Sequence, residues 1–364
     1  MNTVICRSSV AKILYVGYRL KEAFRVRRSD TCLALERRSY FYTELWRDAA
    51  SQLGAAIEVL GNEILEIRRG QDCTRVQQNT TALEHAITVE VAKNKPLVHR
   101  LLAKRQLRTP NYCEFTLNEI AKAADFVEDV ASKCVVKPAN GGGGRGVTTG
   151  VSGGFSLIRA AASAAVYGND LMVEQQVHGD VYRLLYLDGV LIDAVLRKPS
   201  AVVADGKSTV RELIRSENEA RLKTGANLAH ALIVIDTDVR STLAAQGLTL
   251  SSVPAKATRI TLKMVINDNS QHDNYNAKHL LCRSIIQDGA SAAAAVGVRL
   301  AGIDVITPDP AMPLAESGGV ILEVNTTPSY HHHYYKRDGS YPVAVHLLPF
   351  LLANGVAEQQ TTAA

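Results

Sequence analysis

The chain has 364 residues, a length that suggests two or three domains and allows a large core. Hydrophobic residues make up 46% and charged residues 21%, and the net charge of +5 comes from scattered positions, so we expect no nucleic-acid partner. No apolar stretch is long enough to cross a membrane, and Arg7 and Lys12 interrupt any run that would resemble a signal peptide. The six cysteines show neither CxxC pairs nor zinc-ligand spacing, which favours reduced thiols in a cytoplasmic protein without a membrane partner.

The N-terminal region shows signals for both strands and helices. The run from Ile13 to Gly17 is interpreted as a first strand, and Thr43 as the cap of a helix that ends at Gly54. Two alternating apolar runs follow, at 56–60 and 64–67, and the Gly-Asn pair between them predicts a hairpin. No chemistry is assigned to this region.

Two helices are predicted next. The first runs from Leu83 to Lys93, and Pro96 suits the first turn of the second. On these residues alone, Lys95 is a solvated lysine at the start of a helix. A helix over 117–130 and a strand over 133–137 are expected to follow.

The most informative stretch is CVVKPANGGGGRGVTTGV, from Cys134 to Val151. A short β-branched run predicts a buried strand that brings in Lys137 and stops at Pro138. The loop behind it contains Gly141, Gly142, Gly143, Gly144, Arg145 and Gly146. Glycines can adopt positive φ and turn their N–H groups toward an anion, as phosphate-binding loops do. The lysine precedes the glycines and no helix follows them, so the spacing fits neither a P-loop nor a dinucleotide fingerprint. Taken alone, a phosphate-binding hairpin and an ordinary surface hairpin are equally compatible with this stretch.

A helix over 155–166 and a strand over 171–177 are predicted beyond the glycine hairpin. The Asp-Gly pair at 188–189 then predicts a turn, which puts Arg183 and Arg197 on adjacent strands. Their two guanidinium groups could clamp phosphate or carboxylate oxygens bidentately. Structural pairing of each arginine with a neighbouring acid is the alternative.

Acidic residues interrupt two apolar runs near the C-terminus, at 302–306 and 319–325. Side chains alternate along a strand, so Glu323 and Asn325 point to the same face, and Asp304 on a neighbouring strand could join them. Such oxygen ligands suit Mg²⁺, which binds one or two carboxylates together with substrate phosphates. The alternative is a set of acids that pair with arginines, in which every buried carboxylate needs its own partner.

A glycine flap with a lysine at its base, followed by strands that carry Asp and then Glu-x-Asn, resembles the ATP-grasp superfamily. Within it the chain is most similar to the ATP-grasp region of cyanophycin synthetases, with RimK-type and D-alanine–D-alanine ligases as more distant relatives. The resemblance implies an α/β (α+β) ATP-grasp fold with two α+β lobes that grip ATP. We expect these lobes at 85–180 and 181–352, a small α/β preface domain at 1–84, and a tail at 353–364.

The resemblance also implies roles for individual residues. The nucleotide site is expected to comprise Lys95, Lys137, the loop from Gly141 to Gly146, adenine contacts from Glu174, Gln175 and Val177, and a ribose contact from Asp180. The metal site, expected to hold two Mg²⁺ ions or Mn²⁺, comprises Asp304, Glu323 and Asn325. Arg183, Arg197 and Lys263 are the expected catalytic cations. For Glu174, an exposed surface acid is nearly as well supported.

One phrase is especially family-specific, and two segments depart from the family. The phrase VVADGKSTVRELI at 202–214 is close to one found in cyanophycin synthetases. In contrast, 262–272 keeps a cation at Lys263 and an amide at Asn267 but lacks the serine-threonine-glycine tail of the family segment that holds the substrate. After Asn325 the chain has polar and aromatic residues with three adjacent histidines, 331–333, which we interpret as a wall of the acceptor pocket, because sequence neighbours rarely chelate one metal ion together.

The resemblance predicts an ADP-forming carboxylate–amine ligase that joins amino acids or small peptides through an acylphosphate. Alternatives are an ATP-binding regulatory or scaffold protein with lost catalysis, and a ligase whose acceptor is a hydroxyl or a thiol. No Mur-ligase-like half follows the metal strand, so we expect the chain not to be a complete polymerising cyanophycin synthetase. A homodimer or a higher homo-oligomer is compatible with the resemblance.

Overall fold

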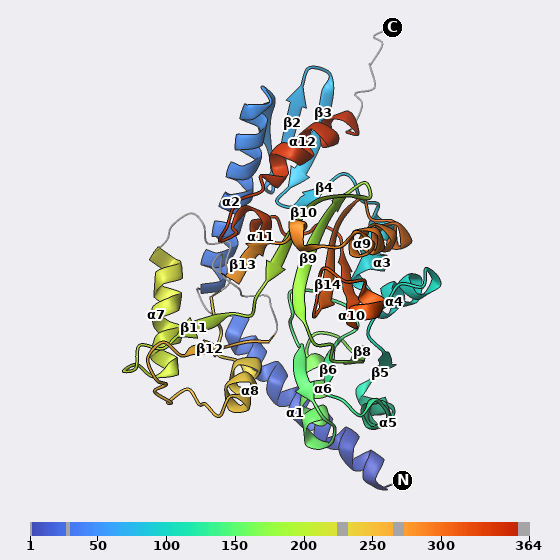
Figure 1. Cartoon of the computed structure of the whole chain (residues 1–364), viewed down its shortest axis with the longest axis vertical. Coiled ribbons are helices and arrows are strands. Elements are labelled where there is room, and N and C mark those ends of the chain that lie inside the picture. The colour runs from blue at the N-terminus through green and yellow to red at the C-terminus, as the bar shows by residue number, and fades with distance from the viewer. Residues whose placement is uncertain (1, 27–29, 224–231, 265–272, 356–364) are drawn as a thin grey trace.

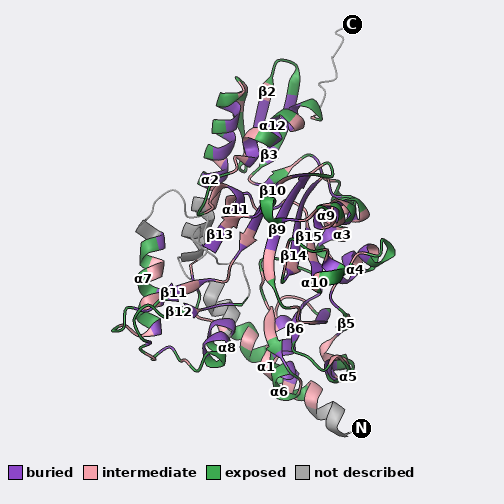
Figure 2. Cartoon of the chain, viewed as in Figure 1, coloured by how far each residue is buried: buried purple, intermediate pink, exposed green. Residues whose placement is uncertain are grey.

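The structure of the protein is a computed structural model that describes residues 2–26, 30–223, 232–264 and 273–355. It is a mixed α/β structure with a central sheet, a four-stranded sheet below it and another above it in the view of Figure 1. Helices cover these sheets, and the buried residues concentrate on the strands and on the inner helix faces (Figure 2). None of the described helices has the length and hydropathy needed to cross a bilayer.

The central sheet is antiparallel, with the order β13-β10-β9-β14-β15. Its strands are β13 (Asn274–Asn276), β10 (Val190–Arg197), β9 (Asp180–Leu187), β14 (Leu300–Thr307) and β15 (Val320–Asn325). Helix α9 (Arg283–Val296) packs on one face, and α3 (Ala86–Lys93) and α4 (Lys95–Lys104) pack against it. The same strands therefore carry two kinds of side chain: apolar ones that are buried on this face, and the polar residues of the predicted site.

The sheet that carries the glycine hairpin has the order β5-β8-β6-β7. These strands are β5 (Tyr112–Phe115), β8 (Leu171–Gln175), β6 (Cys134–Pro138) and β7 (Thr148–Val151). A 3₁₀ turn (Leu117–Glu119), α5 (Ile120–Val130) and α6 (Gly154–Ala164) accompany the sheet. The predicted strand–hairpin–strand arrangement is confirmed, and so is the helix over 155–166 to within two residues. The helix predicted over 117–130 is divided into the 3₁₀ turn and α5, which begins three residues later than expected. Strand β8 ends at Gln175, two residues earlier than expected.

The predicted first strand at Ile13 is wrong, because these residues lie within the long helix α1 (Asn2–Val26). Ala11 is fully buried, and Val10, Leu14 and Tyr15 are partly buried in the core formed with α5 and α6. A short β-branched run is compatible with a strand or a helix, and here packing against the hairpin lobe determines the outcome.

Helix α2 (Asp30–Gln52) extends much further toward the N-terminus than expected, so Thr43 lies inside it and does not cap it. The buried face begins at Phe41 and Tyr42 and continues to Ala50. The predicted hairpin is confirmed as β1 (Ala56–Gly61) and β2 (Ile64–Arg69), and β3 (Asp72–Gln77) and β4 (Thr80–Thr81) complete its sheet.

The C-terminal helix α12 (Val343–Ala353) packs on α2 and on this N-terminal sheet (Figure 1). The N-terminal region therefore shares its core with the end of the chain, and the boundaries at 84 and 352 stay predictions.

A smaller unit contains β11 (Ala201–Val203), β12 (Arg259–Thr261), α7 (Val210–Lys223) and α8 (Thr237–Ala245). The short helices α10 (Leu314–Ser317) and α11 (His331–Tyr334) flank β15. Cys73, Cys113, Cys134 and Cys282 carry free thiols.

Candidate functional site

A cavity of about 600 Å³ lies between the glycine hairpin, the central sheet and the loop after β15. The predicted site residues that line it are Lys95, Lys137, Gly141, Gly142, Gly143, Gly144, Arg145, Val177, Asp180, Arg183, Arg197, Asp304, Glu323 and Asn325. Residues far apart in the sequence thus converge on one space. Four further predicted residues, Gly146, Glu174, Gln175 and Lys263, lie outside its lining.

The glycine loop has the backbone that its composition predicts. Gly141, Gly143, Gly144 and Gly146 have φ values of +120°, +68°, +63° and +74°. A Cβ atom at Gly146 would lie 2.7 Å from the Tyr167 ring, so this position also lacks room for a side chain. Arg145 lies over the same ring, 5.8 Å from its centroid. The end of the loop is therefore tightly packed, while its glycine-rich part borders the cavity.

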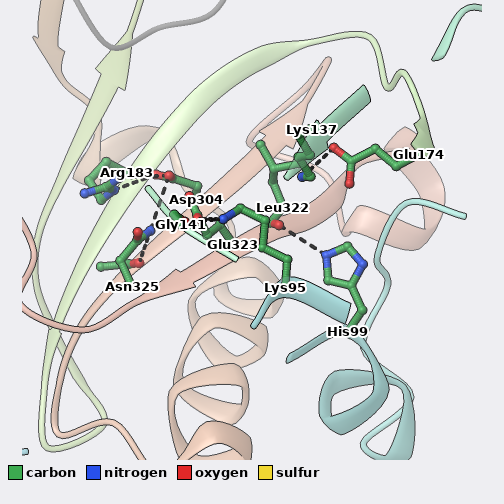
Figure 3. A network of polar contacts seen from close by, with 11 residues as sticks. Lys95, His99, Lys137, Gly141, Glu174, Arg183, Asp304, Leu322, Glu323 and Asn325 are labelled. Carbon is green, nitrogen blue, oxygen red and sulfur yellow. Dashed lines mark hydrogen bonds and ion pairs between the residues drawn. The ribbon is translucent and has the colours of Figure 1, made fainter. Parts of the chain in front are cut away.

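Lys95 connects the glycine loop to the central sheet (Figure 3). Its backbone N–H donates to the carbonyl of Ala139, and its ammonium donates to the carbonyl of Gly141. The same ammonium lies 3.2 Å from Glu323 Oε1. Asn94 caps α4, because its Oδ1 accepts a hydrogen bond from the N–H of Leu97. Lys95 is thus held at the cavity and is not a freely solvated residue at a helix start.

Lys137 and Glu174 form a buried ion pair, with Nζ 2.7 Å from Oε1 and both side chains less than a tenth exposed. The alternative of Glu174 as an exposed surface acid is therefore wrong. Glu174 Oε2 is buried and has no hydrogen-bond partner in the described part of the chain. The role of Glu174 as an adenine contact stays a prediction.

The segment that follows β8 crosses toward the central sheet. A Cβ atom at Gly179 would lie 2.4 Å from the carbonyl carbon of Thr307, so only glycine permits this approach. Asp180 follows at the start of β9, where Lys198 Nζ lies 2.6 Å from its Oδ2. Val177 and Asp180 both line the cavity, whereas Gln175 pairs with Asn111 through its backbone and side chain.

Arg183 and Asp304 face each other across β9 and β14 and form a bidentate pair. Arg183 Nη2 donates to Asp304 Oδ2 at 2.8 Å, and Nε donates to Oδ1. Burial alone would raise the pKa of Asp304, but the adjacent guanidinium outweighs it and holds this pKa below its ordinary value. Burial, and then the charge of Arg183, lowers the pKa of Arg197 to about 10. Asp304 and Glu323 both act on the charges of Arg183 and Arg197, so these four groups form one electrostatic cluster.

The predicted metal ligands lie together as expected from their strands. Asp304 is opposite Glu323, and Gly302 is opposite Asn325. Asn325 Nδ2 donates to the carbonyl of Gly302 at 3.1 Å and lies 3.5 Å from Asp304 Oδ2 (Figure 3).

Two carboxylates and one amide form an oxygen donor set that fits Mg²⁺, with further ligands expected from substrate phosphates. In the part of the chain that the structure describes, no cluster of three His, Cys, Asp or Glu side chains could hold an ion. The set is therefore incomplete without the phosphates, and Arg183 and Lys95 balance its two carboxylates.

Lys263 is the one expected catalytic cation that is not among the residues lining the cavity. Its ammonium is 2.9 Å from Asp236 Oδ2, and the cavity is lined by its neighbour Met264. The described geometry thus gives Lys263 a structural ion pair and no place at the cavity. Asn267 and the rest of this segment to His272 lie outside the described residues.

The histidine run contributes to the wall only in part. His331 and His332 line the cavity, and His332 Nδ1 is buried without a hydrogen-bond partner among the described residues. His333 is fully buried beneath them, where its Nδ1 lies 2.7 Å from Asp193. Tyr334 and Tyr335 pack against Phe41, away from the cavity.

Two residues that line the cavity come from the region to which no chemistry was assigned. Arg38 belongs to α2, and Asn79 lies between β3 and β4. Nothing in the local sequence distinguishes Arg38 from the other arginines of the N-terminal region, because its position depends on long-range packing.

His99, which the sequence pattern also did not single out, lies close to the predicted metal strand. Its Nε2 lies 3.3 Å from the carbonyl of Leu322, the residue before Glu323.

Comparisons with known proteins show similar sequences and a similar fold. Over 313 residues the chain is 27% identical to a cyanophycin synthetase of Trichormus variabilis, across 81% of this chain and 34% of that protein. Over 306 residues it is 28% identical to the glutathione biosynthesis bifunctional protein GshAB of Enterococcus faecalis, across 82% of this chain and 40% of that protein. No protein-family model matches the chain.

The fold is similar to the crystal structure of a bifunctional glutathione synthetase from Pasteurella multocida. The TM-score is 0.56 and the identity 25%, over 83% of this chain and 42% of that one. The chain thus spans between about a third and two fifths of the length of these relatives. The ordered motifs, the cavity on which they converge and these similarities all agree with the expected resemblance to the ATP-grasp superfamily.

Proposed function

We propose that the protein is an ADP-forming ligase that joins the carboxylate of one amino acid or small peptide to the amine of another. The observation that carries this proposal is the convergence of the glycine loop, Lys95, Arg183 and the acids of β14 and β15 on one cavity. A carboxylate is a poor electrophile, so its oxygen first attacks the γ-phosphorus of ATP, which gives an acylphosphate and ADP. The amine then attacks the acyl carbon, the C–N bond forms, and phosphate leaves.

In this proposal, the residues around the cavity stabilise the charge of the transferring phosphoryl group. Lys95 and Lys137 carry the positive charges next to the glycine loop, and the N–H groups of the loop donate to phosphate oxygens. Asp304, Glu323 and Asn325 would hold Mg²⁺, which neutralises phosphate charge when it is bound. Arg183 and Arg197 would orient oxyanions on the side of the central sheet.

The present ion pairs imply a rearrangement on substrate binding. Glu323 is occupied by Lys95, and Asp304 by Arg183. As phosphates and a cation enter, the two basic side chains would transfer from the carboxylates to phosphate oxygens. Because Lys95 also holds Gly141, this exchange would couple loop position to nucleotide binding. Closure of the loop would exclude water, which otherwise hydrolyses an acylphosphate.

The free thiols support a cytoplasmic reaction as part of the proposal. The relatives named above are a cyanophycin synthetase and a protein of glutathione biosynthesis, and this similarity supports amino acids or peptides as the substrates here.

A matrix of substrates tests the function. Purified protein with ATP and Mg²⁺ is incubated with pairs drawn from carboxylate and amine panels, while ADP release and product mass are measured. The expected result is ADP formation that requires both partners, with a product mass equal to their sum minus water. Tight ATP binding without phosphoryl transfer to any acceptor would instead support an ATP-binding protein without catalysis. Products with hydroxyl or thiol acceptors only would assign a different acceptor class.

A further inference from the structure

A positive side chain enters the cavity from the N-terminal region of the chain. Arg38 of α2 lines the cavity together with Asn79. Arg38 Nη2 donates to Asn79 Oδ1 at 3.0 Å, and Asn79 Nδ2 donates to the carbonyl of Thr327 in the loop after β15. Asn79 therefore holds the guanidinium of Arg38 beside the residues that directly follow the predicted metal strand.

Buried aromatic residues hold this arrangement in place. Tyr42, one turn after Arg38, accepts a hydrogen bond from the N–H of Tyr330 at 3.2 Å. The hydroxyl of Tyr330 donates to the carbonyl of Asn79 at 3.3 Å, and Trp46 Nε1 donates to the carbonyl of Gln78 at 2.8 Å. All three aromatic side chains are nearly or fully buried. The position of Arg38 is thus determined by a packed core, as is typical of residues that bind ligands specifically.

The charge of Arg38 is not neutralised by the described protein. Its contacts there are Asn79 and the face of the Tyr42 ring, 5.7 Å away, and no described carboxylate pairs with it. Its Nε is buried and lacks a hydrogen-bond partner among the described residues. Hydrogen bonds from Ser39 and Gln78 lower the pKa of Glu63, and the charge of Arg38 lowers it to a smaller degree, but the two side chains form no ion pair in the described part of the chain. A guanidinium with unused buried donors is unfavourable unless an anion binds to it.

The balance of charge around the cavity supports the same conclusion. Six basic side chains and three carboxylates line it. Lys95, Lys137 and Arg145 lie at the glycine loop, where a triphosphate is expected. Arg38 instead contacts Asn79 in the turn between β3 and β4, and Asn79 donates to the loop after β15. His332 also lines the cavity with a buried Nδ1 that has no partner among the described residues. These donors suit a second anion, separate from the nucleotide.

We propose that Arg38 binds a substrate carboxylate that does not react, so that one substrate of the ligase is an amino acid or peptide with a free carboxylate beyond the group that is joined. The inference rests on the proposed ligase function for its substrate class. Arg38 is then a specificity-determining residue supplied by the N-terminal region.

The test compares Arg38→Gln with Arg47→Gln. Arg47 lies on the same helix, and its pair with Glu44 is about half exposed, so it serves as the matched control. The panel contains L-aspartate, L-glutamate, Ala-Glu and Glu-Ala, each as the free acid and as its α-amide. Binding is measured by calorimetry with the ATP analogue AMP-PNP and Mg²⁺, and kcat/KM is measured for any member that gives ADP.

We expect wild type and Arg47→Gln to bind at least one free acid about 10- to 100-fold more tightly than its amide, the usual range for charged hydrogen bonds. Arg38→Gln should bind the acid and the amide within about threefold of each other, with unchanged affinity for the amide and for AMP-PNP. Arg38→Lys, which keeps the charge but loses the planar fork, should discriminate to an intermediate degree. Melting temperatures show whether each variant is folded, and Arg38→Lys provides the test if Arg38→Gln is not.

The proposal would be overturned if the wild type bound the free acid and the amide equally, or bound neither. It would also be overturned if folded Arg38 variants still preferred the free acid as strongly as the wild type does. A variant that loses only affinity for AMP-PNP would assign Arg38 to the nucleotide and would overturn the proposal as well. A failure of the ligase function looks different. In that case no pair gives ADP, while calorimetry still detects the preference for the acid and its dependence on Arg38.

Discussion

Lys95 binds both halves of the nucleotide site at once, because its ammonium contacts the carbonyl of Gly141 and lies 3.2 Å from Glu323 Oε1. The first contact is to the glycine loop and the second to the strand with the predicted metal ligands. A single side chain thus links the position of the loop to the charge of the metal site. The loop is therefore held toward the central sheet by this side chain.

Lys95→Met should therefore impair nucleotide binding and phosphoryl transfer together. Loss of this charge is expected to raise the KM for ATP and to lower kcat by about 10²-fold or more, by analogy with the loss of other preorganised electrostatic contacts. Steady-state ADP release measures both effects. Lys93→Met is the control, since Lys93 lies two residues earlier in an exposed pair with Glu90. Equal activity of the two variants would contradict the role of Lys95.

Gly146→Ala tests the packing at the end of the glycine loop. The new Cβ would meet Tyr167 at 2.7 Å and the Cα of Ala164 at 3.1 Å, at a position with φ +74°. Strain and overpacking should together destabilise the protein by about 2–4 kcal/mol, measured by urea unfolding. At Gly142, where φ is not positive and no atom lies within 4 Å, alanine should change stability by less than about 0.5 kcal/mol. Similar losses in both variants would refute the packing argument.

The glycine hairpin and the paired acidic strands could be predicted because their signals are local. Glycine runs, Pro138 and alternating apolar residues specify turns and strands within a few positions, and the structure places β6, β7, β14 and β15 accordingly. The pairing of Asp304 with Glu323 then follows from antiparallel register. What the local pattern could not show is that each acid already has a basic partner, since Arg183 and Lys95 come from other elements.

The errors share one physical cause, which is long-range packing. The run at Ile13 has strand-like composition, but α1 forms because Ala11 and Leu14 pack against the hairpin lobe. Arg38 reaches the cavity only because α2 packs against Tyr330 and α12. The ion pair of Lys263 with Asp236 also depends on packing, and the catalytic role of Lys263 stays a prediction. None of these contacts has a signature in the adjacent residues.

The buried His99 predicts a loss of stability in mild acid. Burial, and then the charge of Lys137, lowers the pKa of His99 to about 4, from an ordinary value of 6.5. Between these values the unfolded state binds the proton and the folded state does not, so stability falls as pH decreases from 6.5 to 4. The contribution is at most about 3 kcal/mol.

His99→Gln should flatten this part of the stability curve. Urea midpoints measured between pH 4 and 7.5 provide the slope for each variant. His279→Gln serves as the control because His279 is exposed on a 3₁₀ turn, so its loss should leave the slope unchanged. The same slope in wild type and His99→Gln would show that His99 does not titrate as proposed.

Glu323→Gln separates the metal-ligand role of Glu323 from a merely structural one. If this carboxylate holds Mg²⁺ next to the phosphates, the isosteric change should leave nucleotide bound but slow single-turnover ADP formation by about 10²–10³-fold. Stability should change by less than about 1 kcal/mol, because the pair with Lys95 is partly exposed and Lys95 keeps its contact with Gly141. A structural ion pair predicts the opposite combination, a lower melting temperature with nearly normal turnover. Glu114→Gln is the control, since it removes a strand carboxylate from an exposed pair with Arg100 and should affect neither measurement. Normal single-turnover kinetics of folded Glu323→Gln would remove Glu323 from the metal site and weaken the assignment of Asp304 and Asn325 beside it.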